Sequence, residues 1–293
     1  MKIVFIGTVE FSKKTLEKLI DMKTNIVGVC TKEQSKFNSD FSDLTQLCNK
    51  NKIPCRFVEN INAKDNVDWI KSLDPDIVFC FGWSSLIKSE LLSVPPMGVL
   101  GYHPAKLPNN RGRHPLIWSL VLGLKQSAST FYFMDENPDS GDILSQEDFI
   151  ISDSDDARTL YSKVTKISLN QIKNFIPKLE DKTFVTTKQN HRVANTWRKR
   201  DKYDGEIDFR MNSKSIYNLV RALTRPYVGA HVEYKNMDIT VWKVKVIENN
   251  QTNIESGKVI DSCNNSFVVK TNDGAIQILE HEFKKLPMIG EYL

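Results

Sequence analysis

The sequence predicts an α/β fold, a Rossmann-like parallel sheet followed by a small OB-like β-barrel domain. In the first part of the chain, short apolar strands alternate with amphipathic helical segments, which is typical of a parallel sheet with right-handed crossovers. In the last part, short β-like runs separated by Gly and Asn turns dominate, which is typical of a small barrel. We therefore expect an α/β domain at 1–180, a connector at 181–206 and a β domain at 207–293.

Apolar runs define the elements expected in the first domain. Lys2–Ile6, Asn25–Thr31 and Asp76–Gly82 read as strands, and an apolar run without alternation is typical of a strand buried on both faces. Ser129–Met134 is also rich in β-forming residues. A long helix is expected over Asp155–Ile176, because the acidic residues at its start can cap it and oppose its dipole.

The last domain is expected to combine one helix with several strands. The helix, Ser213–Leu223, has apolar residues at helical spacing that should face inward: Ile216, Leu219, Val220 and Leu223. The expected strands are His231–Tyr234, Ile239–Ile247, Lys258–Ile260, Phe267–Lys270 and Ala275–Leu279.

Composition excludes several classes of protein. None of the apolar stretches among the 293 residues is long enough to span a membrane, and the five cysteines lack CxxC spacing. We therefore expect reduced thiols, a cytoplasmic location, no disulfide framework and no metal site. The formal charge of +4 permits an anionic substrate without indicating extensive nucleic-acid binding.

The most informative stretch runs from Gly98 to Gln146. An apolar strand ends at His103, because Pro104 cannot donate to a sheet, and a later β-rich run ends in the acidic turn Asp135–Asp142. If these strands were parallel, the histidine and a carboxylate would meet at the sheet edge where open α/β sheets bind ligands. A histidine after a strand and an acidic turn are both common surface features, so spacing alone favours no catalytic role.

The residues of this stretch resemble the formyltransferase family that uses N10-formyltetrahydrofolate. The matching motifs are His103, the loop residues Leu107-Pro108 and Arg111-Gly112, and the turn that begins at Asp139. The resemblance implies that His103 and Asp139 are catalytic, with His103 serving the developing oxyanion or the proton transfer and Asp139 orienting it.

One position departs from the family pattern. The family motif usually reads Asn-x-His, whereas this chain reads Gly101-Tyr102-His103. A bound water, a backbone N–H group, or a side chain from Asn109 or Asn110 could replace the missing amide, and the sequence does not choose among them.

The resemblance also implies where the co-substrate N10-formyltetrahydrofolate binds. Ser85, Leu86 and Ile87 lie where the family's backbone holds the pterin ring, and Arg113 and Asp135, together with the catalytic Asp139, are expected beside the folate.

Four residues are candidates for binding the second substrate. Arg198 and Arg200 lie in a basic and aromatic segment that reads equally as a solvated charge run or as a diphosphate clamp, since guanidinium groups match phosphate oxygens. Arg221 and Tyr227 lie in a segment that resembles the family's domain junction.

Three hypotheses for the function stay open: an N-formyltransferase for a nucleotide-linked amino sugar, a methionyl-tRNA formyltransferase, and a non-catalytic binding protein of the same fold. The loop Lys32–Asp40 is short and lacks Arg and Gly, which disfavours tRNA because phosphate contacts dominate nucleic-acid affinity. Arg111–Pro115 followed by Trp118 resembles the sugar enzymes. The first hypothesis is therefore favoured.

The family resemblance implies a 4-amino-4,6-dideoxyhexose as the acceptor sugar and a role in polysaccharide biosynthesis. The expected partner is thus a nucleotide-linked amino sugar, with no nucleic acid and no membrane, and the family resemblance also allows a homodimer. The sequence identifies neither the sugar nor the nucleotide.

Overall fold

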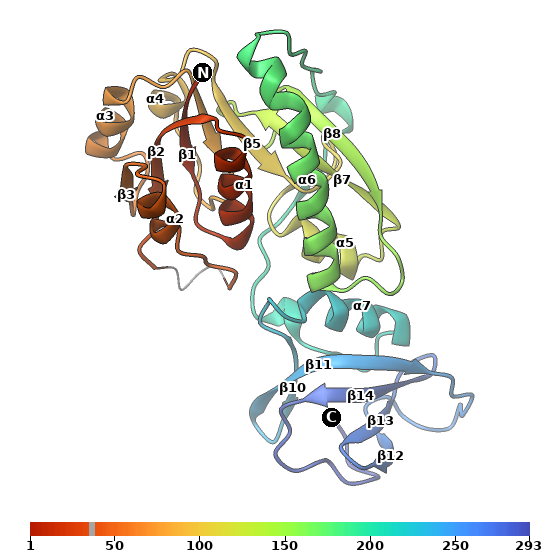
Figure 1. Cartoon of the computed structure of the whole chain (residues 1–293). Helices are drawn as coiled ribbons and strands as arrows, with labels where there is room; N and C mark the ends of the chain where they lie inside the picture. Colours follow the sequence, from red (N-terminus) through yellow and green to blue (C-terminus); the bar gives the residue numbers. More distant parts are fainter. Residues whose placement is uncertain (35–38) are drawn as a thin grey trace. The chain divides into compact units, whose positions relative to one another are not determined.

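The computed structural model describes residues 1–34 and 39–293 (Figure 1). Part of the loop 32–40, whose composition disfavours tRNA, therefore lies outside the described residues. The chain forms two compact units. The first contains residues 1–115, 126–149 and 162–197, and the second contains residues 116–125, 150–161 and 198–293.

The helices and strands follow the predicted alternation along the chain. The helices are α1 (Glu10–Asp21), α2 (Thr45–Lys50), α3 (Lys64–Ser72), α4 (Ser89–Leu92), α5 (Pro115–Val121), α6 (Ala157–Glu180) and α7 (Ser213–Leu223), with short 3-10 turns at His191–Val193 and Tyr203–Gly205. The strands are β1 (Lys2–Ile6), β2 (Asn25–Thr31), β3 (Cys55–Phe57), β4 (Ile77–Cys80), β5 (Val99–His103), β6 (Arg111–Gly112), β7 (Gln126–Phe133), β8 (Ile143–Ile150), β9 (Thr196–Trp197), β10 (Ala230–Tyr234), β11 (Met237–Ile247), β12 (Val259–Cys263), β13 (Ser266–Lys270) and β14 (Ala275–His281).

A seven-stranded sheet in the order β3-β2-β1-β4-β5-β7-β8 forms the centre of the first unit. The ladders that join β1 to β2, β1 to β4, β2 to β3 and β4 to β5 are all parallel. β7 runs antiparallel to β5, which the sequence did not indicate. The prediction was a Rossmann-like parallel sheet followed by a small OB-like β-barrel domain. The fold class is confirmed, as a mainly parallel α/β sheet followed by a separate antiparallel β domain.

Alternate residues of the central strands build two separate cores. On one face, Val4 and Val78 pack with Ile70 of α3, and the same cluster contains Cys80. On the other face, aromatic side chains stack on one another, and Phe11 of α1 stacks on Tyr102 of β5. Because side chains alternate along a strand, the neighbours of Tyr102 in β5, Gly101 and His103, face the first core.

A five-stranded antiparallel sheet in the order β10-β11-β14-β13-β12 forms the second unit together with α7. The four apolar residues predicted to face inward from α7 are buried: Ile216, Leu219, Val220 and Leu223. The antiparallel β domain expected after the α/β part is therefore confirmed.

Three local features differ from the prediction. β8 and the two-stranded pair of β6 with β9 were not expected. The long helix α6 contains Pro177 and continues to Glu180, although proline has no N–H to donate to the residue four positions before it. None of the described helices is long and apolar enough to cross a membrane. The predicted division at 1–180, 181–206 and 207–293 stays a proposal.

Candidate active site

His103 lies at the end of β5, where the strand meets Pro104, and the residue is 5% exposed. Its Nε2 lies 2.7 Å from the backbone carbonyl oxygen of Asn110, and its Nδ1 lies 3.7 Å from Oδ2 of Asp139. A carbonyl oxygen can only accept, so Nε2 carries a proton in this arrangement. The nitrogen that can exchange a proton is therefore Nδ1, on the side of Asp139.

Two donors hold the carboxylate of Asp139. The backbone N–H of Gly112 donates to Oδ2 at 2.8 Å, and the Tyr132 hydroxyl donates to Oδ1 at 2.7 Å. The backbone of Asp139 has φ 55°, in the left-handed region that Asp and Asn tolerate better than most residues. The turn and the two donors together fix the carboxylate beside His103.

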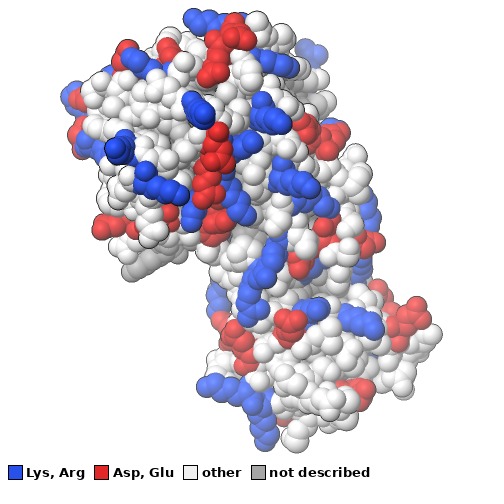
Figure 2. Space-filling view, in the orientation of Figure 1, with Lys and Arg blue, Asp and Glu red and all other residues white. Residues whose placement is uncertain are grey.

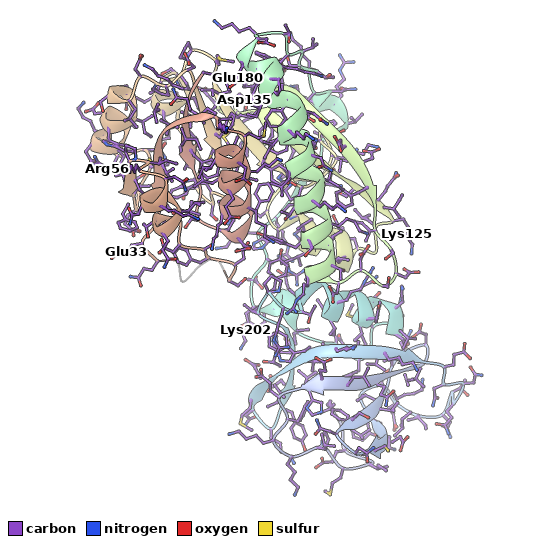
Figure 3. The ribbon with its side chains drawn as sticks, in the orientation of Figure 1. Glu33, Arg56, Lys125, Asp135, Glu180 and Lys202 are labelled. Carbon is purple, nitrogen blue, oxygen red and sulfur yellow. The ribbon has the colours of Figure 1, made fainter. Side chains whose placement is uncertain are left out.

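The route by which Asp139 reaches His103 differs from the prediction. β7 is antiparallel to β5, with Thr130 opposite His103, so the end of β7 does not lie at the same sheet edge as the end of β5. The expectation of two strand ends at one edge was therefore wrong. The acidic turn after β7, which contains Asp135 (Figure 3), places the carboxylate of Asp139 against Tyr132 of that strand instead.

A buried glutamine connects the acidic turn to the loop after β5. Gln189 donates through Nε2 to the backbone carbonyls of Asp139, at 3.0 Å, and Gly141, at 2.7 Å. Its Oε1 accepts from Arg111 at 2.7 Å. The sequence prediction missed Gln189, because its partners lie 48 to 78 residues away along the chain.

The position of the missing amide is crowded. A Cβ atom on Gly101 would lie 2.6 Å from Cε of Met134 and 3.1 Å from Cζ of Tyr132. Of the expected substitutes, Asn110 contributes its backbone carbonyl to His103, as described above. The ring of Tyr132 lies where a side chain at residue 101 would project.

Three residue groups expected to bind folate lie in the first unit. Arg113 donates to the backbone carbonyl of Ser84 at 2.8 Å, which places Arg113 beside the segment containing Ser85, Leu86 and Ile87. In this segment Leu86 is 63% exposed, whereas Ile87 is buried. Asn62 fixes the segment, because its Nδ2 donates to the carbonyl of Leu86 at 2.8 Å.

The third group is the turn at Asp135, whose carboxylate accepts hydrogen bonds from the Asn137 backbone and the Ser140 hydroxyl. These contacts order the turn that contains Asp139. The structure thus brings Arg113 next to the segment of Ser85, Leu86 and Ile87, and the predicted roles in folate binding stay a proposal.

Arg198 and Arg200 lie in the second unit, where Asp204 organises them. Arg198 donates to both carboxylate oxygens of Asp204, and Arg200 donates to its backbone carbonyl. Both guanidinium groups also lie over the Trp118 ring, at 5.4 and 4.9 Å from its centroid. The contact with Arg198 lowers the pKa of Asp204 to about 2.

The two arginines differ in access. Arg200 is 8% exposed, and burial lowers the pKa of its guanidinium. The side chain of Arg198 is 62% exposed. Arg198 is therefore the better placed of the two to meet a ligand from solvent.

Arg221 is buried and bonded to the backbone. Its Nη1 donates to the carbonyls of Asp155, at 2.8 Å, and Ser152, at 3.0 Å, and its Nε donates to Asn218. These bonds join α7 to the segment before α6 within the second unit. Tyr227 follows α7, and its backbone N–H donates to the carbonyl of Thr224. The predicted substrate-binding roles of Arg221 and Tyr227 stay a proposal.

Known proteins identify the class of this arrangement. Residues 1–175 match the Formyl transferase family, and residues 199–292 match the Formyl transferase C-terminal domain. The chain therefore belongs to the formyl transferase family, and the predicted enzyme class, a formyl group transferase, is confirmed.

The relatives of this chain include two kinds of formyltransferase. The methionyl-tRNA formyltransferase of Clostridioides difficile (strain 630) is 29% identical over 299 residues, which cover 100% of this chain and 96% of the relative. WlaRD, a sugar 3N-formyltransferase solved with dTDP and 5-N-formyl-THF, is 20% identical, with a TM-score of 0.72 over 98% of this chain and 99% of that chain. The N-formyltransferase of Helicobacter canadensis, solved with folinic acid and dTDP-3-aminofucose, is 19% identical, with a TM-score of 0.72 over 96% and 99%.

Proposed function

We propose that the protein moves a formyl group from N10-formyltetrahydrofolate to the amino group of a nucleotide-linked amino sugar. The observation that carries the chemistry is the pair of the buried His103 and the partly buried Asp139, with Nδ1 facing the carboxylate at 3.7 Å. Formyl transfer to an amine needs a group that accepts a proton and a group that stabilises the resulting charge. The pair supplies both.

The reaction begins when a neutral amine attacks the formyl carbon, so that a C–N bond forms and an oxyanion develops. The amine then loses a proton to Nδ1 of His103, directly or through one water, and the folate nitrogen departs when its C–N bond breaks and a proton is returned to it. Asp139 stabilises the imidazolium that forms, because its carboxylate is held in place by Gly112 and Tyr132.

The donor is assigned to the surface around Arg113. Its contact with Ser84 joins the loop after β5 to the segment of Ser85, Leu86 and Ile87, whose backbone is expected to hold the pterin ring. The relatives WlaRD and the Helicobacter canadensis enzyme were solved with a formylated folate, which supports the same donor here.

The acceptor is assigned to a sugar nucleotide for two reasons. The loop Arg111–Pro115 and Trp118 resemble the sugar enzymes, and two structural relatives were solved with dTDP or a dTDP-sugar. Arg198, with its exposed guanidinium, is the proposed contact for the diphosphate. A 4-amino-4,6-dideoxyhexose on UDP or dTDP is the proposed substrate, in polysaccharide biosynthesis.

The second candidate function is formylation of methionyl-tRNA, favoured by the name of the Clostridioides difficile relative. On the face shown in Figure 2, basic and acidic side chains are interspersed over both units rather than gathered into one basic stripe. A stripe of Lys and Arg is the usual electrostatic footprint of a nucleic-acid site. That face therefore gives the tRNA hypothesis no support.

Thermal unfolding with added ligands tests the proposal. A ligand that binds only the folded protein raises the melting temperature with its concentration. We expect dTDP or UDP to raise Tm, and GDP and CMP to raise it less. If initiator methionyl-tRNA raises Tm and none of the four nucleotides does, the proposal is wrong.

A further inference from the structure

Tyr132 lies directly opposite Gly101 in the antiparallel ladder between β5 and β7, so both residues face the same side of the sheet as His103. The Tyr132 side chain is buried, with the whole residue 3% exposed. Its Cζ atom would lie 3.1 Å from a Cβ atom on Gly101. Met134, whose Cε would lie closer still at 2.6 Å, and the phenol of Tyr132 together fill the space that a side chain at residue 101 would need.

The hydroxyl of Tyr132 reaches the charged member of the pair. It donates to Oδ1 of Asp139 at 2.7 Å, while Oδ2 faces Gly112 N–H and His103 Nδ1. Burial first, and then the nearby Asp139 carboxylate, raise the pKa of Tyr132 well above its ordinary value. The phenol therefore keeps its proton and remains a donor.

From this placement, we infer that Tyr132 is a positioning residue, which holds the Asp139 carboxylate against His103 through its hydroxyl. This inference deepens the proposed function and rests on it. A side chain at residue 101 would have to displace Met134 and would also press on the ring of Tyr132. Tyr132 acts through Asp139, and it does not replace a group that contacts the formyl oxygen.

The test compares a tyrosine whose hydroxyl contacts Asp139 with a tyrosine whose hydroxyl does not. Tyr132→Phe removes the hydroxyl that contacts Asp139 and keeps the ring. Tyr102→Phe removes a hydroxyl that lies 3.0 Å from Ser129 Oγ on the opposite face of the sheet. Both variants should fold, because each keeps its ring and loses only the contacts of one hydroxyl.

A kinetic cycle measures the effect on positioning. Tyr132→Phe should lower kcat by about 10-fold, the scale of a hydrogen bond to a charged group, with KM for either substrate changed by less than about 2-fold. In an Asp139→Asn background the same substitution should lower kcat by less than about 2-fold, since the group that it positions is gone. Tyr102→Phe should leave kcat unchanged in both backgrounds. Equal losses from Tyr132→Phe in both backgrounds, or no loss in either, would overturn the inference.

A crystal structure of Tyr132→Phe separates this inference from the proposed function. We expect the Asp139 carboxylate to rotate and its contact with Gly112 or His103 to lengthen. An unmoved carboxylate would overturn the positioning role. If the wild type transfers no formyl group to any acceptor and the carboxylate still rotates, the proposed function fails and the positioning role stands.

Discussion

Asp139→Asn is the substitution that most selectively removes the charge beside His103. Asparagine has the same shape as aspartate, and it is among the few residues that tolerate the φ of 55° found at this position. Its Oδ1 can accept from Gly112 N–H, and its Nδ2 can donate to the Tyr132 hydroxyl oxygen. The turn should therefore keep its geometry.

The loss of stability is estimated from the two hydrogen bonds that Gly112 and Tyr132 make with residue 139, which change from charged to neutral. A hydrogen bond to a charged group contributes about 1.5–3 kcal/mol and a neutral one about 0.5–1.5 kcal/mol, so each bond weakens by about 1 kcal/mol. The free energy of unfolding should fall by about 2 kcal/mol at most. The loss in kcat should be about 100-fold or more, because a neutral amide cannot stabilise the imidazolium of His103.

The assay is steady-state formyl transfer from N10-formyltetrahydrofolate, with enzyme concentration fixed by amino-acid analysis. Asp148→Asn is the matched control, because Asp148 is a surface carboxylate paired with Lys106, and its removal should leave kcat unchanged. Near-normal turnover of Asp139→Asn, with the control also normal, would refute the catalytic assignment.

Three further predictions concern other parts of the chain. Gly101→Asn should leave kcat unchanged or lower it, because the new Cβ would crowd Met134. An increase in kcat of about 100-fold would instead show that the wild type lost activity with the amide. Arg198→Ala should raise KM for the sugar nucleotide by about 10-fold. The control Arg210→Ala breaks a similar arginine–aspartate pair and should leave KM unchanged. Equal KM values for the two variants would show that Arg198 does not bind the diphosphate. The pKa of Asp204 is lowered to about 2 by its hydrogen bond with Arg198. The pairing therefore stabilises the folded state at pH values above the ordinary pKa of a carboxyl group, and this contribution is lost as the pH falls toward 2. The stability difference between wild type and Arg198→Ala, measured by denaturant unfolding, should therefore shrink between about pH 4 and pH 2, and a constant difference would contradict this.

Several strands and helices of both units could be predicted from local pattern, whereas β6, β8 and β9 could not. Apolar runs located β1 and β2 with their observed bounds, and helical spacing identified the buried side of α7. The direction of β7 could not be predicted, because periodicity along a strand is the same in a parallel and an antiparallel ladder.

The sequence predicted the two central residues of the candidate site, and it did not predict the residues that hold them in place. Motif resemblance located His103 and Asp139, which the structure brings to 3.7 Å. Tyr132 carried one sequence signal, a large polar aromatic residue in the strand before the acidic turn, and its relation to Gly101 appears only when the ladder register is known. No sequence signal identified Gln189, because its role depends on contacts with residues far away along the chain.

The measurement that tests the central claim most directly is a side-by-side acceptor assay. Equal amounts of enzyme and N10-formyltetrahydrofolate are given a dTDP- or UDP-linked amino sugar in one reaction and initiator methionyl-tRNA in the other, with His103→Ala as the blank. We predict a formamide on the sugar nucleotide, detected by mass spectrometry, and no formyl-methionyl-tRNA above the blank. Formyl-methionyl-tRNA produced at a rate equal to or above that of the sugar product would contradict the account.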